Sequence, residues 1–119
     1  MNKKIYKILK TKNKKKLVCL TAYSKPIAKI LDKYCDIVLV GDSLATAMYG
    51  MKNTHSVTLD TMIQHGISVA SSTSKSLCIV DMPANSYKDK KMAIRNAKSI
   101  LKKTKCDAVK IESNGKNYD

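Results

Sequence analysis

The sequence contains no phenylalanine and no tryptophan, so its six tyrosines are the only large aromatic side chains available to a core. Ile, Leu, Val, Ala and Met must therefore fill the interior. With 119 residues, 44% of them hydrophobic, the chain has the length of one domain and enough apolar content for a single core.

Arginine is also nearly absent, since all but one of the 23 basic residues are lysine and Arg95 is the exception. The formal charge of +14 suggests nucleic acid or an acidic surface as a partner. Base readout and bidentate phosphate contacts favour arginine, however. The lysines gather in residues 1–16, 88–91 and 102–105, which are typical of a terminal arm and of the solvated ends of a helix. We expect no specific nucleic-acid partner, and a basic nucleic-acid-binding domain stays an alternative that rests on charge alone.

Paired cysteines and long apolar runs are missing. The cysteines at 19, 35, 78 and 106 form no CxxC and show no metal-type spacing with His55 or His65. Cys19 and Cys78 lie in apolar runs, which predicts reduced thiols in the core. No apolar segment follows the basic N-terminus as in a secretory signal, and none approaches the ~20 residues of a spanning helix. We expect a soluble, cytoplasmic protein without membrane contact.

What the chain does contain is an alternation of apolar patterns. Val-, Ile- and Leu-rich runs predict four short strands, at 17–21, 36–40, 76–81 and 107–112. Steps of three and four predict helices between them, at 25–34, 58–74 and 88–105, with residues 44–57 irregular. A further short helix is expected in the basic arm of residues 1–16, from the spacing of Ile5, Ile8 and Leu9. This order predicts an α/β fold with a parallel sheet and right-handed crossovers. The pattern alone leaves open whether the sheet is flat or part of a barrel.

Charged side chains follow three of these strands at the point where each ends. Asp42 and Ser43 follow the second strand, Asp81 ends the third, and Lys110 and Glu112 lie on one face of the fourth. The carboxyl ends of parallel strands meet at one edge, where ligands bind in such folds. Carboxylates held together need a cation or a proton between them, and oxygen ligands suit Mg²⁺. Lys110 would then pair with Glu112 or hold an anionic substrate.

Simpler interpretations remain open for each residue. Asp42 or Asp81 alone is compatible with a turn or a helix cap, and Lys110 with Glu112 is compatible with a plain ion pair. Three acids at three equivalent strand ends favour a site over these readings. Ring side chains elsewhere are expected to be loop, helix-surface or core-edge residues rather than ligands: His55, His65, Tyr23 and Tyr87.

Five segments together resemble the ketopantoate hydroxymethyltransferase family, in that family's order and near its spacing. They are LTAYS (20–24), LVGDSLA (39–45), VTLDTMIQHG (57–66), VDMPANSY (80–87) and AVKIE (108–112). The resemblance implies a (βα)₈ barrel of the TIM type, a large homo-oligomer and Mg²⁺. It also implies transfer of a hydroxymethyl group from 5,10-methylenetetrahydrofolate to 3-methyl-2-oxobutanoate, which gives 2-dehydropantoate in pantothenate biosynthesis.

The same resemblance implies roles for individual residues. Asp42, Asp81 and Glu112 match the family's metal ligands, and Asp42 with Ser43 matches the site of the keto-acid carboxylate. Asp81 and Lys110 match further substrate-binding residues. The family's catalytic base, a glutamate of the second half of the barrel, has no counterpart in this chain.

A complete (βα)₈ barrel takes ~250 residues. We therefore expect residues 17–119 to form a partial barrel of about four strands, preceded by the arm of residues 1–16. Ser24 stands where the family usually has Asp, and Ala84 where an aromatic residue is usual. An N-terminal fragment that needs a complementing C-terminal half, or that assembles as a homo-oligomer, is the expected state. A non-catalytic half-barrel that serves in interaction or assembly is the alternative.

Overall fold

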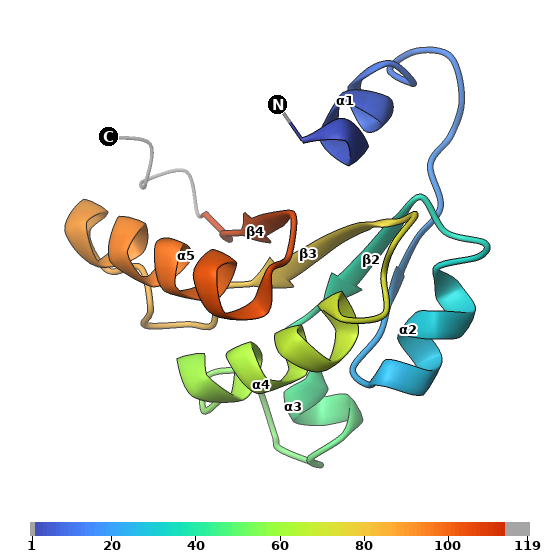
Figure 1. Ribbon diagram of the computed structural model, residues 1–119. Helices are drawn as coiled ribbons and strands as arrows, with labels where there is room; N and C mark the ends of the chain where they lie inside the picture. Colours follow the sequence, from blue (N-terminus) through green and yellow to red (C-terminus); the bar gives the residue numbers. More distant parts are fainter. Residues whose placement is uncertain (1, 114–119) are drawn as a thin grey trace.

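The computed structural model describes residues 2–113 and contains one sheet of four parallel strands, which lie in the order β1-β2-β3-β4 (Figure 1). The strands are β1 (Cys19–Thr21), β2 (Ile37–Val40), β3 (Leu77–Asp81) and β4 (Ala108–Lys110). The helices are α1 (Lys3–Leu9), α2 (Lys25–Leu31), α3 (Leu44–Ala47), α4 (Leu59–Ala70) and α5 (Lys90–Thr104). The predicted α/β fold is confirmed, and its βα units are arranged as in part of a TIM-type barrel.

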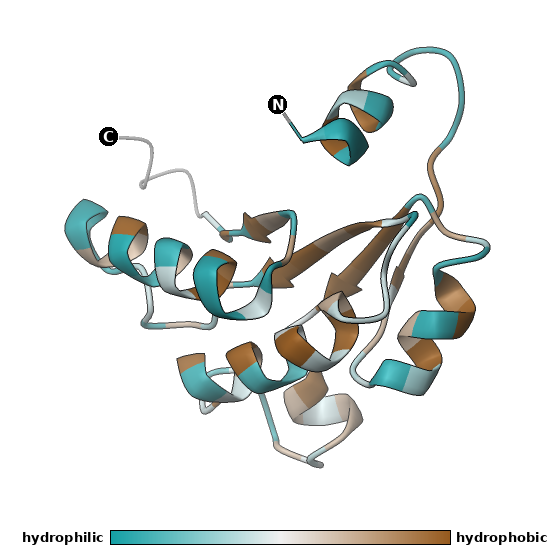
Figure 2. Ribbon diagram, viewed as in Figure 1, coloured by the Kyte–Doolittle hydropathy of each residue, from teal (hydrophilic) through white to brown (hydrophobic). Residues whose placement is uncertain are grey.

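The core lies between the sheet and the helices α2, α4 and α5, which Figure 1 shows on one side of it. Val38, Val40 and Val80 on this side are completely buried. The strands are among the most apolar parts of the ribbon in Figure 2. Val40 pairs with Val80, and Val80 with Val109, so one side chain from each of β2, β3 and β4 shares this face. Because all the pairings are parallel, the carboxyl ends of the four strands lie at the same edge of the sheet.

Helix α4 shows how the local sequence produces the packing. The Thr58 side chain accepts a hydrogen bond from the backbone N–H of Thr61, which caps the helix as the sequence predicts. Met62, Val69 and Gly66 are buried along one face. A Cβ placed on Gly66 would lie 2.7 Å from Cγ2 of Thr104, so the missing side chain allows α4 and α5 to approach closely.

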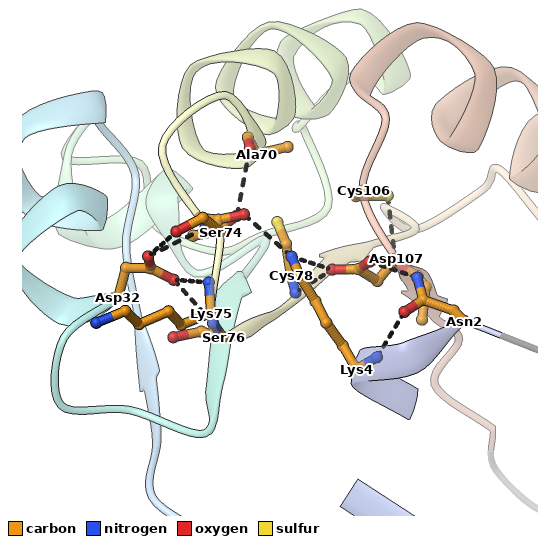
Figure 3. Close-up of polar contacts among 12 residues, drawn as sticks. Asn2, Lys4, Asp32, Ala70, Ser74, Lys75, Ser76, Cys78, Cys106 and Asp107 are labelled. Atoms are coloured by element: carbon orange, nitrogen blue, oxygen red, sulfur yellow. Dashed lines mark hydrogen bonds and ion pairs between the residues drawn. The ribbon is translucent and has the colours of Figure 1, made fainter. Parts of the chain in front are cut away.

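Asp32 ties α2 to the segment that precedes β3, at the amino-terminal edge of the sheet (Figure 3). Its carboxylate accepts backbone hydrogen bonds from Ser74, Lys75 and Ser76 at 3.0, 2.9 and 2.8 Å. Partial burial alone would raise the pKa of Asp32, but these donors outweigh it and lower the pKa to about 2. The charged form is therefore part of the folded structure.

Asp107 binds α1 to the same edge of the sheet (Figure 3). Its carboxylate accepts from Nδ2 of Asn2 at 2.6 Å and from the backbone N–H of Cys78 at 2.9 Å. Nζ of Lys4 lies 3.0 Å from Asp107 and also 3.0 Å from the carbonyl oxygen of Thr73. The basic arm thus contains the expected short helix, and polar contacts fix that helix. Its separation from residues 17–119 as an arm stays a prediction.

The first strand differs from the prediction. The expected buried strand at 17–21 is in fact the shorter β1, and Cys19, Leu20 and Thr21 are all exposed. Cys19 is therefore not a core thiol, because β1 pairs with β2 on one side only and forms the edge of the sheet. Cys78 meets the expectation, since burial raises the pKa of its thiol to about 12 and keeps it neutral.

Other boundaries differ as well, since the helices expected at 25–34 and 58–74 end at Leu31 and Ala70. Residues 44–57 were expected to be irregular but contain the single-turn helix α3. The fourth strand ends at Lys110, so Glu112 lies beyond it. In the part of the chain that the structure describes, no helix is both long and apolar enough to cross a membrane.

Candidate functional site

Asp81 is the centre of the polar cluster at the carboxyl ends of the strands. It is the last residue of β3, and its side chain is 5% exposed. Oδ2 accepts a hydrogen bond from the backbone N–H of Asp42 at 3.1 Å. Oδ1 is buried and accepts no well-aligned hydrogen bond from the described residues, but Nζ of Lys110 lies 2.7 Å away. The buried charge is thus balanced by one ammonium group.

Lys110 bridges two of the predicted acids. It ends β4 in register with Asp81, and its Nζ lies 3.2 Å from Oε1 of Glu112. Partial burial opposes the charged form, but the close carboxylates of Asp81 and Glu112 raise the pKa of Lys110 overall. Glu112 lies beyond β4 and therefore shares no strand face with Lys110, but its side chain, which is 70% exposed, still reaches the Lys110 ammonium.

Asp42 follows β2 through Gly41 and completes the set of acids. Burial raises its pKa, and the negative charges of Asp81 and Glu112 raise it further. A side-chain hydrogen bond from Thr54 and the charge of Lys110 act in the opposite direction. Three carboxylates therefore influence one another at this edge, and the structure brings all five predicted site residues into one neighbourhood.

Ser43 presents a hydroxyl beside this cluster. Its Oγ lies 2.7 Å from the hydroxyl of Tyr23, which comes from the segment after β1. A Cβ on Gly41 would lie 3.0 Å from Oγ of Ser43 and 3.6 Å from Oδ2 of Asp81. Gly41 therefore leaves the space in which the serine and the aspartate come together.

Sequence reasoning missed three contributors. Tyr87 packs against the core as expected, and its phenol also bonds to the backbone of Glu112. Burial, followed by the charges of Glu112 and Asp42, raises the pKa of Tyr87. Thr54 lies in a segment without periodicity that gave no signal. His65 was expected on a helix surface, yet it is half-buried and bonded through both ring nitrogens.

The chemistry of the cluster suits a hard cation and an anionic ligand. Carboxylate oxygens from two neighbouring strand ends are the donors that Mg²⁺ prefers, and Oδ1 of Asp81, which meets the Lys110 ammonium, is one of them. Within residues 2–113, no three His, Cys, Asp or Glu side chains form a ready-made metal site. The ammonium of Lys110 lies between Asp81 and Glu112 instead. The donor set fits the metal, and Lys110 would have to share these carboxylates with it.

Comparisons with known proteins match this chain to one family. A family model described as ketopantoate hydroxymethyltransferase matches residues 2–119. A Pelagibacter ubique protein named 3-methyl-2-oxobutanoate hydroxymethyltransferase is 55% identical over 116 residues, which are 98% of this chain and 45% of that protein. Proteins of the same name from Anaplasma marginale and Rhizobium etli are 54% and 53% identical over 85% of this chain, and 36% and 37% of theirs. The chain spans less than half the length of these relatives.

Proposed function

Because this chain belongs to the ketopantoate hydroxymethyltransferase family, we propose that it supplies the metal- and substrate-binding half of a hydroxymethyltransferase. In this reaction 5,10-methylenetetrahydrofolate supplies the one-carbon unit and water supplies its hydroxyl oxygen, so that 3-methyl-2-oxobutanoate becomes 2-dehydropantoate and tetrahydrofolate is released. The observation that carries this proposal is the connected set at the strand ends, in which Asp81 is bonded to the backbone of Asp42 and paired with Lys110.

Asp42, Asp81 and Glu112 would hold Mg²⁺, and the ion would withdraw electrons from the keto group of a bound substrate. The Ser43 hydroxyl, with Asp42 beside it, is suited to the substrate carboxylate. The Lys110 ammonium would stabilise the negative charge that develops when the substrate loses its C3 proton. These roles support binding, orientation and charge stabilisation by the chain's own groups.

Removal of the C3 proton needs a base, and our proposal assigns that role to no residue of this chain. Its single glutamate, Glu112, is assigned to the metal. We place the base in a second half-barrel, either a C-terminal continuation or a complementing chain, and we expect the assembled barrels to form a homo-oligomer in the cytoplasm. The four cysteines are all free, which fits a reducing compartment.

A half-barrel that acts only in assembly is the second candidate, and exposed apolar side chains at both edges favour it. At one edge, Leu20 of β1 is 49% exposed and Ile30 of α2 is 54% exposed. Tyr34, which follows α2, is 74% exposed. At the other edge, Ile94 of α5 and Ile111 after β4 are 47% and 44% exposed. Such surfaces and unpaired edges call for a covering partner.

The test is a titration of 3-methyl-2-oxobutanoate with Mg²⁺, by calorimetry. The chain is measured alone and after mixing with the segment of the Pelagibacter ubique relative that lies beyond the matched region. We expect binding, and formation of 2-dehydropantoate, only in the mixture. Asp42→Asn should abolish both, whereas Asp60→Asn, an exposed acid of α4, should leave them unchanged.

Tight binding by the chain alone would contradict the need for a second half. If neither form binds the keto acid and size-exclusion chromatography shows a defined oligomer of the chain alone, the assembly module is the better description.

A further inference from the structure

The Ser43 hydroxyl is held by a tyrosine and not by the helix that it begins. Ser43 precedes α3, yet its side chain caps no backbone N–H of that helix in the described structure. Its Oγ lies 2.7 Å from the Tyr23 hydroxyl. A phenol is the more acidic of the two hydroxyls and therefore the better donor. When Tyr23 donates, the proton of Ser43 stays available for an anion.

The backbone of Tyr23 is fixed in turn by His65 of α4. Nδ1 of His65 lies 2.6 Å from the carbonyl oxygen of Tyr23. A carbonyl oxygen only accepts, so Nδ1 must carry a proton. This contact joins α4 to the segment that follows β1, two parts of the chain that are 42 positions apart.

The other ring nitrogen of His65 has a partner that completes this arrangement. Nε2 lies 2.8 Å from the Tyr49 hydroxyl, and the two rings meet edge to face with centroids 5.9 Å apart. In a neutral ring protonated on Nδ1, Nε2 accepts, so Tyr49 donates. One tautomer of His65 therefore satisfies both contacts.

We propose that Tyr23 and His65 are positioning residues, which fix the Ser43 hydroxyl with its proton directed at the carboxylate of the keto acid. The order of contact is Tyr49, His65, Tyr23, Ser43, and we call these four residues the Ser43 relay. The identity of the ligand rests on the proposed function. The hydrogen bonds of the relay do not.

Substrate binding tests the contact between Tyr23 and Ser43, at the end of the relay that meets the ligand. The titration uses 3-methyl-2-oxobutanoate and Mg²⁺, with the chain alone or the complemented barrel, whichever binds. Tyr23→Phe should weaken binding about tenfold, because Ser43 loses the neighbour that orients it. Tyr34→Phe is the matched control on an exposed tyrosine and should bind as the wild type does.

His65 is tested by rescue. His65→Ala should weaken binding about fivefold, whereas His65→Asn, whose amide N–H can take the position of Nδ1, should recover most of the loss. In an active barrel the loss should appear in KM with kcat nearly unchanged, since a carboxylate contact is the same in ground and transition states. Equal losses for His65→Ala and His65→Asn, or unchanged binding in Tyr23→Phe, would overturn the proposal.

A spectroscopic measurement keeps the relay separate from the proposed function. Nitrogen-15 NMR of the histidines in the chain should show the Nδ1-protonated tautomer for His65, and Tyr23→Phe should shift the Ser43 amide. If the keto acid fails to bind in any form, the proposed function fails, and these signals alone decide the relay. An Nε2-protonated His65, or an unmoved Ser43 signal, would show that the relay does not exist.

Discussion

The backbone N–H of Asp42 donates to Oδ2 of Asp81, so the loop after β2 is fastened to the buried carboxylate that ends β3. The same carboxylate meets Lys110 of β4 through its other oxygen. One side chain thus connects the ends of three neighbouring strands. Its substitution should affect ligand binding much more than folding.

Asp81→Asn tests this separation. The amide oxygen can still accept from Asp42, and water can solvate the released ammonium of Lys110, whose side chain is 40% exposed. We expect the free energy of unfolding to fall by about 1 kcal/mol. Binding of Mg²⁺ and keto acid should fall by at least tenfold in calorimetry. Asp60→Asn serves as the control, and equal effects of the two variants on binding would contradict the assignment.

Asp32→Asn should destabilise the fold without a direct effect on the site, because Asp32 lies at the opposite edge of the sheet. Its carboxylate accepts from Ser74, Lys75 and Ser76, and an amide would turn an N–H₂ toward some of those donors. We expect a loss of about 2 kcal/mol in chemical denaturation. A loss no larger than that of Asp60→Asn would show that the three donors are satisfied by water instead.

The acid stability of the protein should depend on the same residue. The folded pKa of Asp32 is about 2, below the 3.8 of the free side chain. Its contribution is therefore complete above about pH 4 and is lost as the pH falls toward 2. Melting temperatures recorded between pH 5 and pH 2 should fall less steeply in Asp32→Asn than in the wild type. Parallel curves would mean that Asp32 titrates normally in the folded state.

Gly66→Ala should destabilise the protein although alanine is the better helix former. The new Cβ would lie 2.7 Å from Cγ2 of Thr104, and Thr104 cannot turn away easily because its Oγ1 donates to Ile100 and accepts from Cys106. We expect a loss of about 2 kcal/mol. Gln64→Ala on the exposed side of α4 should not reproduce it.

Thr104→Ser removes the clashing methyl group and keeps the hydroxyl. The double variant with Gly66→Ala should therefore be more stable than additivity of the two single changes predicts, by about 1 kcal/mol in a double-mutant cycle. Additive losses would place the cause outside the contact with the Thr104 methyl group, either in the helix itself or at Cγ2 of Val80, which would lie 3.2 Å from the new Cβ.

Asp107→Asn should release α1 from the sheet, since Asp107 holds both Asn2 and Lys4. We expect amide hydrogen exchange across Lys3–Leu9 to accelerate at least tenfold, with little change in the strands apart from Cys78, whose N–H also donates to Asp107. Lys4→Met should act in the same direction, and Lys3→Met, on an exposed residue, should not. Unchanged exchange in Asp107→Asn would show that other contacts dock the helix.

The sequence predicted the alternation of strands and helices because core-facing residues such as Val38, Val80 and Met62 repeat with clear periods. It also predicted the location of Asp42, Asp81 and Lys110, since strand direction alone places strand ends together. The prediction that the first strand is buried was wrong. An apolar run indicates that its side chains favour burial, but it does not indicate whether a second neighbouring strand is present to cover them.

The contacts that refine the site come from packing, which periodicity does not encode. His65 lies on the helical pattern of α4 as an ordinary polar position, and only the approach of Tyr23 and Tyr49 gives it two partners. Tyr87 likewise reaches Glu112 through the loop after β3, whose course no local pattern specifies. The roles of the five predicted site residues stay predictions until the titrations are done.

The order β1-β2-β3-β4 matches the order of synthesis, and this has a consequence for folding kinetics. Each strand pairs with the strand that precedes it, so every new βα unit finds its partner already made and no strand has to wait for a later one. Mean sequence separation between contacts is then low for a parallel sheet, which favours rapid folding. We expect these four units to assemble stepwise on the ribosome, with the Asp42–Asp81 contact formed as soon as β3 has emerged.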